Sequence, residues 1–267
     1  MTARPASLTL DDDRTIRIVE EIRRTAAIGL RFRDGLTGRT IRDGLVVSAQ
    51  RMDGRPVGPA HRSSNAIHWF HAPEPPGDVN YYVSIRDIRG KHLSTTLLIE
   101  LPPSTSETVV SDHYLFPTIA RALLPGFLSV RADLADADAT RREAPDHRGP
   151  AKFAQMEVSL ADGSSWFGMS DRNGRVVVAV PALDPTRGGV EISITVNYED
   201  LAPPMRLTGI PTFDNICAQR RATLPPDLAP PSAGERTTIT ETLTPDKSLV
   251  LRTGNRSDLL VRKPTQT

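Results

Sequence analysis

Two histidines lie close enough together in the sequence to suggest a metal site. They flank an aromatic pair in His68-Trp69-Phe70-His71, and imidazole nitrogens are common ligands of zinc and copper. A metal ion would need both rings on one side, together with a carboxylate. The apolar residues predict a strand, however, and residues three apart on a strand point to opposite faces. We therefore interpret the motif as an aromatic strand with histidines at its edges, and we predict no metal.

Two groups of aspartates carry the oxygen ligands that Ca²⁺ prefers. Asp133, Asp136 and Asp138 form a D-x-x-D-x-D run, and Asp11-Asp12-Asp13 form a second group. The first run lacks the glycine and the terminal glutamate of a helix-loop-helix calcium site, and Arg141-Arg142 follow closely. We interpret it as a solvated loop. The second group is better explained as negative charge at the start of a helix.

The motifs of covalent and nucleotide-dependent catalysis are absent from the sequence. Gly163-Ser164-Ser165-Trp166 lacks the closing glycine of a G-x-S-x-G turn, and there is neither a P-loop nor a G-x-G-x-x-G run. The one cysteine, Cys217, excludes an intrachain disulfide and fits a small buried side chain. We expect no enzyme activity and no cofactor. A screen for hydrolase activity would reveal a site that sequence motifs miss.

Two apolar segments are stronger candidates, as contacts with another protein. The first, residues 116–125, is bounded by prolines and equally fits a short helical turn packed between two domains. The second, residues 249–261, could add a strand to the sheet edge of a neighbour or form an internal hairpin. The residues predicted to contact a partner are Phe116, Ile119, Leu123, Leu124, Leu249, Leu251, Leu259 and Leu260.

Length and charge limit the classes of protein that fit. The chain has 267 residues, enough for about two domains, and a net charge of +1. This balance argues against nucleic acid as a partner, because phosphate binding needs clustered positive charge. No run approaches the roughly 18–20 apolar residues of a membrane span. Residues 1–13 lack the apolar core of a signal peptide, so we expect a cytoplasmic protein.

Short apolar segments separated by turns dominate the chain. The 23 prolines and 18 glycines fall at short intervals, which is typical of all-β proteins. The most regular alternation predicts a strand at 190–196. One helix is predicted over 12–27, although residues 15–19 also alternate like a strand. In the tail, strands at 237–242 and 248–252 would form a hairpin after an extended proline-rich linker.

Turn and strand motifs recur in the same order in both halves of the chain. In the first half they are Asp34 to Ile41, Asp43 to Val47 and Pro76 to Ile85, and in the second Ser170 to Arg175 before a valine run. Together they resemble the opening turn, the PG-type strand and the hairpin of carboxypeptidase regulatory-like (transthyretin-like) domains. The resemblance implies two β-sandwiches, with residues 136–149 inserted where the family has a short turn.

The sequence thus predicts an all-β protein with two tandem transthyretin-like or Ig-like β-sandwiches, a short N-terminal extension and an extended C-terminal arm. We expect the extension at 1–27, the first sandwich at 28–103, a linker at 104–125, the second sandwich at 126–202, and the proline-rich linker and arm at 203–267.

The layout of the chain also suggests a role. Phe116-Pro117 leading into the second sandwich and the tail at 249–253 resemble accessory proteins of phage-tail-like contractile injection systems. The resemblance implies a structural part of a particle, with other protein subunits or further copies of the chain as partners, assembled in the cytoplasm and released later. The alternative is a stand-alone carbohydrate- or protein-binding module. That alternative predicts a cluster of exposed aromatic residues, and only 5% of the residues are aromatic.

Overall fold

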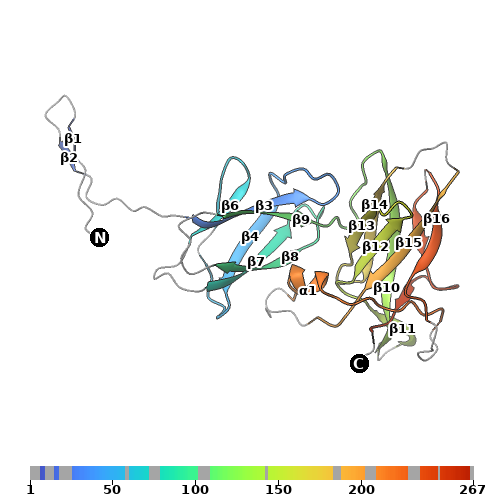
Figure 1. The fold of residues 1–267 in the computed structure, drawn as a ribbon. Helices are drawn as coiled ribbons and strands as arrows, with labels where there is room; N and C mark the ends of the chain where they lie inside the picture. Colours follow the sequence, from blue (N-terminus) through green and yellow to red (C-terminus); the bar gives the residue numbers. More distant parts are fainter. Residues whose placement is uncertain are drawn as a thin grey trace.

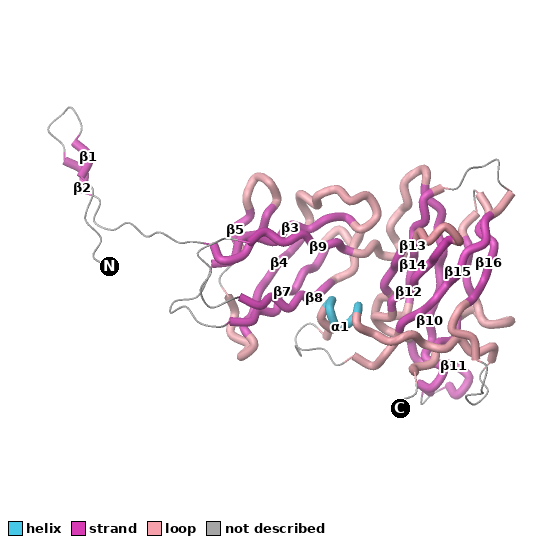
Figure 2. Tube along the Cα trace, viewed as in Figure 1, coloured by secondary structure: helices cyan, strands magenta, loops and turns pink. Residues whose placement is uncertain are grey.

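The structure is a computed structural model whose strands are arranged in several sheets (Figures 1 and 2). It confirms the all-β fold class. Some predicted features lie outside the described residues: the aspartates at 11–13 wholly, and the 76–85 motif and the proline-rich linker in part. The described residues are 7–9, 15–17, 26–57, 60–71, 79–101, 109–141, 144–182, 188–201, 209–227, 235–245 and 247–264.

The first half folds as two sheets that face each other across an apolar core. One sheet has the order β5-β6-β3-β9 and the other the order β4-β7-β8. Alternation along β3 directs Leu30 and Phe32 into the core, where they meet Ile85 of the opposite sheet. Arg31 and Arg33 lie on the other face. The strands are β3 (Ala26–Asp34), β4 (Leu45–Arg51), β5 (His61–Arg62), β6 (Ile67–His71), β7 (Val79–Asp87), β8 (Thr95–Leu101) and β9 (Val109–Leu115).

The segment predicted as a linker over 104–125 contributes β9 to this sandwich. β9 runs parallel to β3, with Val109 opposite Ile28 and Leu115 opposite Asp34. Leu115 is buried in the core of the first sandwich. The predicted boundary at residue 103 is therefore corrected, because the first core needs a strand that follows it.

The second half also forms two facing sheets. One has the order β13-β12-β15-β16, and in the other β10 pairs with β11, β14, β17 and β18. The predicted strand at 190–196 lies within β15, and its Ile192, Ile194 and Val196 are buried. The strands are β10 (Phe127–Arg141), β11 (Ala144–Pro150), β12 (Gln155–Leu160), β13 (Ser165–Met169), β14 (Arg175–Pro181), β15 (Val190–Asn197), β16 (Ile239–Leu243), β17 (Leu249–Leu251) and β18 (Leu259–Val261).

The predicted insertion at 136–149 is part of a sheet. β10 continues to Arg141, and β11 pairs with it antiparallel. Asp136 is buried, its carboxylate accepts a hydrogen bond of 3.0 Å from the Tyr198 hydroxyl, and it lies 3.0 Å from Lys263 Nζ. The solvated-loop interpretation is therefore wrong for Asp136. The lysine and the phenol supply the partners that a buried carboxylate requires.

The C-terminal tail belongs to the second sandwich and forms no hairpin of its own. β16 pairs antiparallel with β15, whereas β17 and β18 pair in parallel with β10 in the opposite sheet. Leu251, Leu259 and Leu260 are buried. The predicted arm is thus corrected: its apolar residues complete the core of the second sandwich.

Near the N-terminus, β1 (Ser7–Thr9) and β2 (Thr15–Arg17) pair antiparallel and lie apart from both sandwiches in Figure 1. The helix predicted over 12–27 is wrong at 15–17 and at 26–27, where the chain is extended. Residues 15–19 fit both a helical spacing and a strand-like alternation of apolar residues, and at 15–17 the chain follows the strand-like alternation. In the part of the chain that the structure describes, no helix is long and apolar enough to cross a membrane.

Two hairpin glycines give a test of the second sandwich. Gly174 has a φ of 80°, and a Cβ there would lie 2.2 Å from the Leu134 carbonyl oxygen; Gly163 has a φ of 87° and open space around it. We expect Gly174→Ala to lower the free energy of unfolding by about 3 kcal/mol or more, because a backbone clash adds to the φ strain. Gly163→Ala should cost only about 1 kcal/mol. Urea denaturation of both variants measures this, and equal losses would contradict it.

The aromatic strand predicted around His68 is confirmed as β6, but His68 does not lie at an edge. Its side chain is buried, with its ring centroid 5.5 Å from that of Phe32. His113 of β9 packs against the same phenylalanine, at 6.3 Å. Its Nε2 is buried without a hydrogen-bond partner among the described residues. His68 is therefore buried beside the first core, and the half-buried His113 packs against it through Phe32.

Acidification is expected to destabilise the first sandwich. Burial lowers the pKa of both His68 and His113. As the pH falls, each histidine is therefore protonated in the unfolded chain before it is protonated in the folded one. The stability that neutral histidine contributes is fully present above the unfolded pKa of about 6.5. It is lost as the pH falls from that value toward the lower pKa of the folded state. The urea midpoint should be lower at about pH 5.5 than at about pH 7.5. His68→Gln should reduce this difference, and the control His61→Gln, at an exposed position, should leave it unchanged.

Candidate functional site at the junction of the two sandwiches

The segment that follows β9 is fixed to the first sandwich by hydrogen bonds. The Phe116 carbonyl accepts one of 2.9 Å from the Leu93 amide. Thr118 donates its amide to the Lys91 carbonyl at 3.0 Å and its hydroxyl to the Gly90 carbonyl at 2.7 Å. The connection between the sandwiches therefore begins along the turn between β7 and β8.

A buried cluster of charged side chains holds this connection. Arg121 binds the Asp34 carboxylate through both terminal nitrogens, with a distance of 2.8 Å from Nη1 to Oδ1. His92 Nε2 lies 3.1 Å from Arg121 Nη1, and Nδ1 lies 2.7 Å from Asp87 Oδ2. No side chain of the four is more than 12% exposed. Bidentate pairing of arginine with a carboxylate is both strong and directional.

The cluster keeps its two carboxylates charged. Burial alone raises the pKa of Asp34. The nearby His92 ring, whose Nε2 lies 3.7 Å from Asp34 Oδ2, and the hydrogen bonds from Arg121 and the Leu36 amide outweigh burial and hold that pKa far below its usual range. The pKa of Asp87 is also lowered, because hydrogen bonds from the Arg89 amide and from His92 outweigh its burial. Asp34 ends β3 and Asp87 ends β7, so the cluster joins both sheets of the first sandwich to the connecting segment.

A second connection crosses from the second sandwich back to the first. Thr212 forms a parallel bridge with Thr96 of β8, and its hydroxyl caps α1 (Phe213–Cys217). After the helix, the Gln219 side-chain amide donates a hydrogen bond of 2.8 Å to the Phe153 carbonyl of the second half. Two separate segments therefore tie the sandwiches together.

Apolar side chains fill the space between these connections. Leu93 and Phe116 of the first half meet Phe153 and Met169 of the second, and Ile216 of α1 packs with them. A shared apolar layer resists separation because parting the sandwiches would expose it to water. We infer that the two sandwiches behave as one unit.

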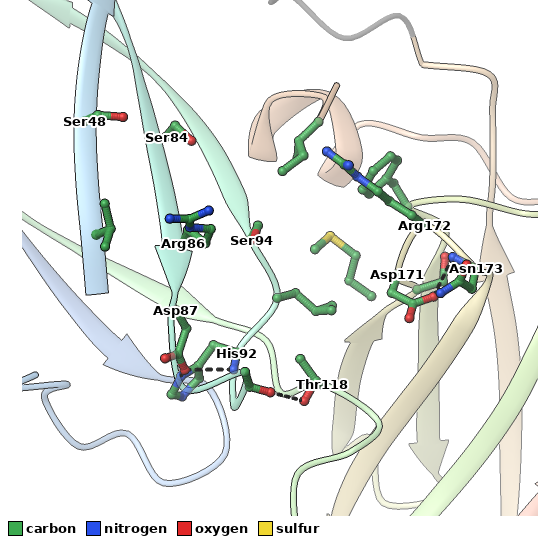
Figure 3. A pocket seen from close by; sticks show the side chains of 17 residues that line it. Ser48, Ser84, Arg86, Asp87, His92, Ser94, Thr118, Asp171, Arg172 and Asn173 are labelled. Carbon is green, nitrogen blue, oxygen red and sulfur yellow. Dashed lines mark hydrogen bonds and ion pairs between the residues drawn. The ribbon is translucent and has the colours of Figure 1, made fainter. Parts of the chain in front are cut away.

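Beside this layer lies an open cleft with a volume of about 740 Å³ (Figure 3). The outward face of β4 and β7 forms one wall, where Ser48 and Ser84 are directly opposite each other and Arg86 follows on β7. The hairpin between β13 and β14 forms the other wall, from which Arg172 extends toward the first sandwich (Figure 3). The walls thus carry hydroxyl groups and two guanidinium groups, together with the carboxylates of Asp87 and Asp171 and apolar side chains such as Met169.

The carboxylates of the cleft are already engaged. Asp171 accepts hydrogen bonds from the amides of Asn173 and Arg175, and Asp87 is held in the buried cluster. Within the described ranges no three histidine, cysteine, aspartate or glutamate residues are grouped so that they could hold a metal ion. Arg86 contributes positive charge and Ser48 and Ser84 contribute hydroxyl groups to the cleft, next to the negative charges of Asp87 and Asp171.

The predicted contact residues of segment 116–125 divide between the junction and the surface. Phe116 packs between the sandwiches, as the alternative interpretation allowed. Ile119 and Leu123 are half-buried, and Leu124 is 49% exposed. Leu124 therefore lies at the surface, whereas Phe116 is largely used within the chain, and contact of Leu124 with a partner stays a prediction.

The predicted contact residues of the tail serve the chain's own fold. Leu251 and Leu259 lie in the core of the second sandwich, Leu249 packs against it, and Leu260 packs with Ala135 and Ala137. The prediction that these leucines bind a partner is therefore corrected. β17 and β18 do add to a sheet edge as expected, but to β10 of the same chain.

No family model and no curated protein matches the chain. Among solved structures it is similar to the Bacillus anthracis TIE protein, with 8% identity over 97% of this chain and 41% of that one and a TM-score of 0.27. It is also similar to GBS52, the minor pilin of Streptococcus agalactiae, with 9% identity over 90% of this chain and 97% of that one and a TM-score of 0.29. A streptococcal ancillary pilin is similar with 11% identity over 88% of this chain and 68% of that one and a TM-score of 0.25. The chain spans less than half the length of the TIE protein, and similarity this low carries no inference about function.

Proposed function

We propose that this protein is a non-enzymatic structural component of a larger assembly and acts through contacts with other protein subunits. The junction carries this proposal. Two chain segments, a shared apolar layer and the buried Arg121–Asp34 pair hold the sandwiches as one unit. The His92–Asp87 pair beside the cleft is engaged with Arg121 and with backbone amides. Such a unit is suited to bearing load or setting a spacing.

The particle that we propose is a phage-tail-like contractile injection system. This finer assignment rests on the sequence resemblance of Phe116-Pro117 and of the tail at 249–253. Residues 249–251 form β17 and are used within the second sandwich, so the tail adds little to this resemblance. The layout of two tandem sandwiches is the main support for the assignment to such a particle.

Co-sedimentation tests the assembly role. The full-length tagged protein is expressed in its native host, clarified lysate is spun in an ultracentrifuge, and the pellet is blotted and imaged by negative stain. We expect the protein to pellet with sheathed, tube-like particles, and Leu124→Glu to weaken this without changing the melting temperature. Met52→Glu, at another exposed apolar position, is the matched control. A soluble monomer with no particle in the pellet would contradict the proposal.

A binding module is the second candidate, because one sheet face presents aromatic residues. Trp69 of β6 is half-buried and covers Gly29 of β3, where a Cβ would lie 2.5 Å from the indole. Tyr114 of β9 is 54% exposed on the same face. Aromatic faces of this kind stack on sugars and on protein side chains. Specific binding on a glycan array that Trp69→Ala removes would favour this candidate.

A further inference from the structure

The outward face of the first sandwich carries an apolar row near the start of β3. Trp69 of β6 and Val110 of β9 are both register partners of Gly29, one on each side of it. The indole lies over the glycine, where a Cβ would be 2.5 Å from the ring, and Ile67 Cγ2 is 2.9 Å from the same position. Val110 is 43% exposed. Because the neighbouring Leu30 faces the core, this row faces away from it.

The next rows on the same face carry an excess of positive charge. Arg31 and Arg33 of β3 share one carboxylate, that of Asp112 on β9, at 2.9 Å from Arg31 Nη2 and 2.8 Å from Arg33 Nε. The three side chains are between 27% and 33% exposed. Two guanidinium groups against one carboxylate leave one positive charge unmatched. The face therefore offers an apolar row first and a positive region further along β3.

The N-terminal segment has residues that match this order. β1 and β2 pair antiparallel, with Leu8 directly opposite Ile16, so the two apolar positions share one face of the hairpin. Asp11-Asp12-Asp13 follow β1 in the sequence. A two-stranded hairpin is marginal alone in water and needs a surface to pack on. An outward face that is apolar and then positive is a surface of the required kind.

The connection to β3 favours the chain's own sheet over that of another copy. β3 begins at Ala26, so Gly29 and its apolar row lie about 10 Å along the strand. The chain from Arg17, the end of β2, to Ala26 can span up to about 30 Å. A connection this short raises the local concentration of the hairpin at the row to the order of 1 mM. A second copy competes only when it approaches that concentration.

We propose that the hairpin of β1 and β2 folds back onto the outward face of its own first sandwich. Leu8 and Ile16 then pack on the apolar row, and residues 11–13 lie toward the two arginines. β2 runs antiparallel to β3, with its end near the start of β3. The hairpin lies apart from both sandwiches in Figure 1, so docking is a movement of the N-terminal segment. The contact lies within one chain, and it goes beyond the proposed assembly role.

Tryptophan quenching tests whether the row is covered. The chain has two tryptophans, and Trp166→Phe in the full-length protein leaves Trp69 as the reporter. We expect acrylamide to quench Trp69 about twofold more strongly when Leu8→Ser and Ile16→Ser are introduced together, because these changes shift the hairpin off the sheet. Equal quenching of the two chains would overturn the proposal.

Two further variants of the reporter chain separate the contacts. Thr9→Ser with Thr15→Ser, at the neighbouring pair of the hairpin, is the matched control and should leave the quenching unchanged. Replacing the aspartates at 11–13 by asparagine should give part of the increase. About 0.5 M NaCl should have the same partial effect, because salt screens exposed charges.

Mixing two chains distinguishes the chain's own sheet from that of a second copy. The reporter chain with Leu8→Ser and Ile16→Ser is mixed with a chain that keeps its N-terminal segment and carries Trp69→Phe and Trp166→Phe. We expect no protection of the reporter up to about 100 µM of the second chain, far below the local concentration within one chain. Protection that returns on mixing would place the hairpin on a neighbour and contradict the proposal.

Hydrogen exchange gives a measure that needs no tryptophan substitution. In the unmodified chain the amides at 15–17 should be protected, and Val110→Ser should speed their exchange about tenfold or more, because a weakened docking site releases the hairpin. Val250→Ser is the matched control, since Val250 is 49% exposed on the second sandwich. Amides at 15–17 that are unprotected, or that respond equally to both variants, would overturn the proposal. No particle is involved, so the assembly role is judged separately.

Discussion

Deleting residues 247–267 is expected to prevent the second sandwich from folding. The deletion removes β17 and β18 from β10, together with the buried Leu251, Leu259 and Leu260. Each buried leucine contributes about 2–5 kcal/mol, and a whole domain is stable by only about 5–15 kcal/mol. Loss of near-UV circular dichroism and of the cooperative melting transition would report this. A truncated chain that melts as cooperatively as the full one would show that the tail is dispensable for the fold.

Neighbouring residues on β17 provide a graded version of the same test. Leu251 is 3% exposed and Val250 is 49% exposed. Leu251→Ala should therefore lower the free energy of unfolding by about 3 kcal/mol, and Val250→Ala by less than about 1 kcal/mol. Urea denaturation separates the two. If both variants lose little, the tail does not pack as described.

Several strands of the two sandwiches could be predicted because their alternation is local. Residues 190–196 of β15 alternate in sequence, and the apolar Ile192, Ile194 and Val196 are buried as this alternation predicts, although Thr195 is buried as well. The pairing of the tail could not be predicted in this way. Local sequence alone predicts that the two strands on either side of Pro245 pair with each other as a hairpin. Instead β16 pairs with β15 and β17 pairs with β10, so that each strand extends a different sheet of the second sandwich. This choice depends on long-range contacts that periodicity does not encode.

The charged cluster at the junction was missed for a similar reason. Asp34 was identified only as part of a turn motif, and it does serve the turn, since its carboxylate accepts a hydrogen bond of 2.8 Å from the Leu36 amide. Its partner Arg121 is 87 residues away, and nothing in the spacing of the two indicates a contact. The one available signal was an arginine inside the apolar segment 116–125, where a charge has to find a partner.

Arg121→Ala is expected to lower the free energy of unfolding by about 3 kcal/mol. The substitution leaves the Asp34 carboxylate buried without its bidentate partner, and an uncompensated buried charge is costly. The separate loss of arginine packing against the first sandwich adds to the effect. Arg89→Ala is the matched control, because Arg89 also binds a carboxylate with two nitrogens but on the surface, where a pair contributes at most about 1 kcal/mol. Chemical denaturation at neutral pH compares the two, and similar losses would contradict the role of burial.

The pH dependence separates the charge interaction from packing. Because the folded pKa of Asp34 is depressed, its contribution is present above the unfolded pKa of about 3.9 and is lost as the pH falls below it. The stability difference between the wild type and Asp34→Ala should therefore narrow on acidification below about pH 4. In a double-mutant cycle, Arg121→Ala should cost much less in the Asp34→Ala background than alone. Additive losses at neutral pH would mean that the two side chains stabilise the junction independently, by packing and not by their pairing.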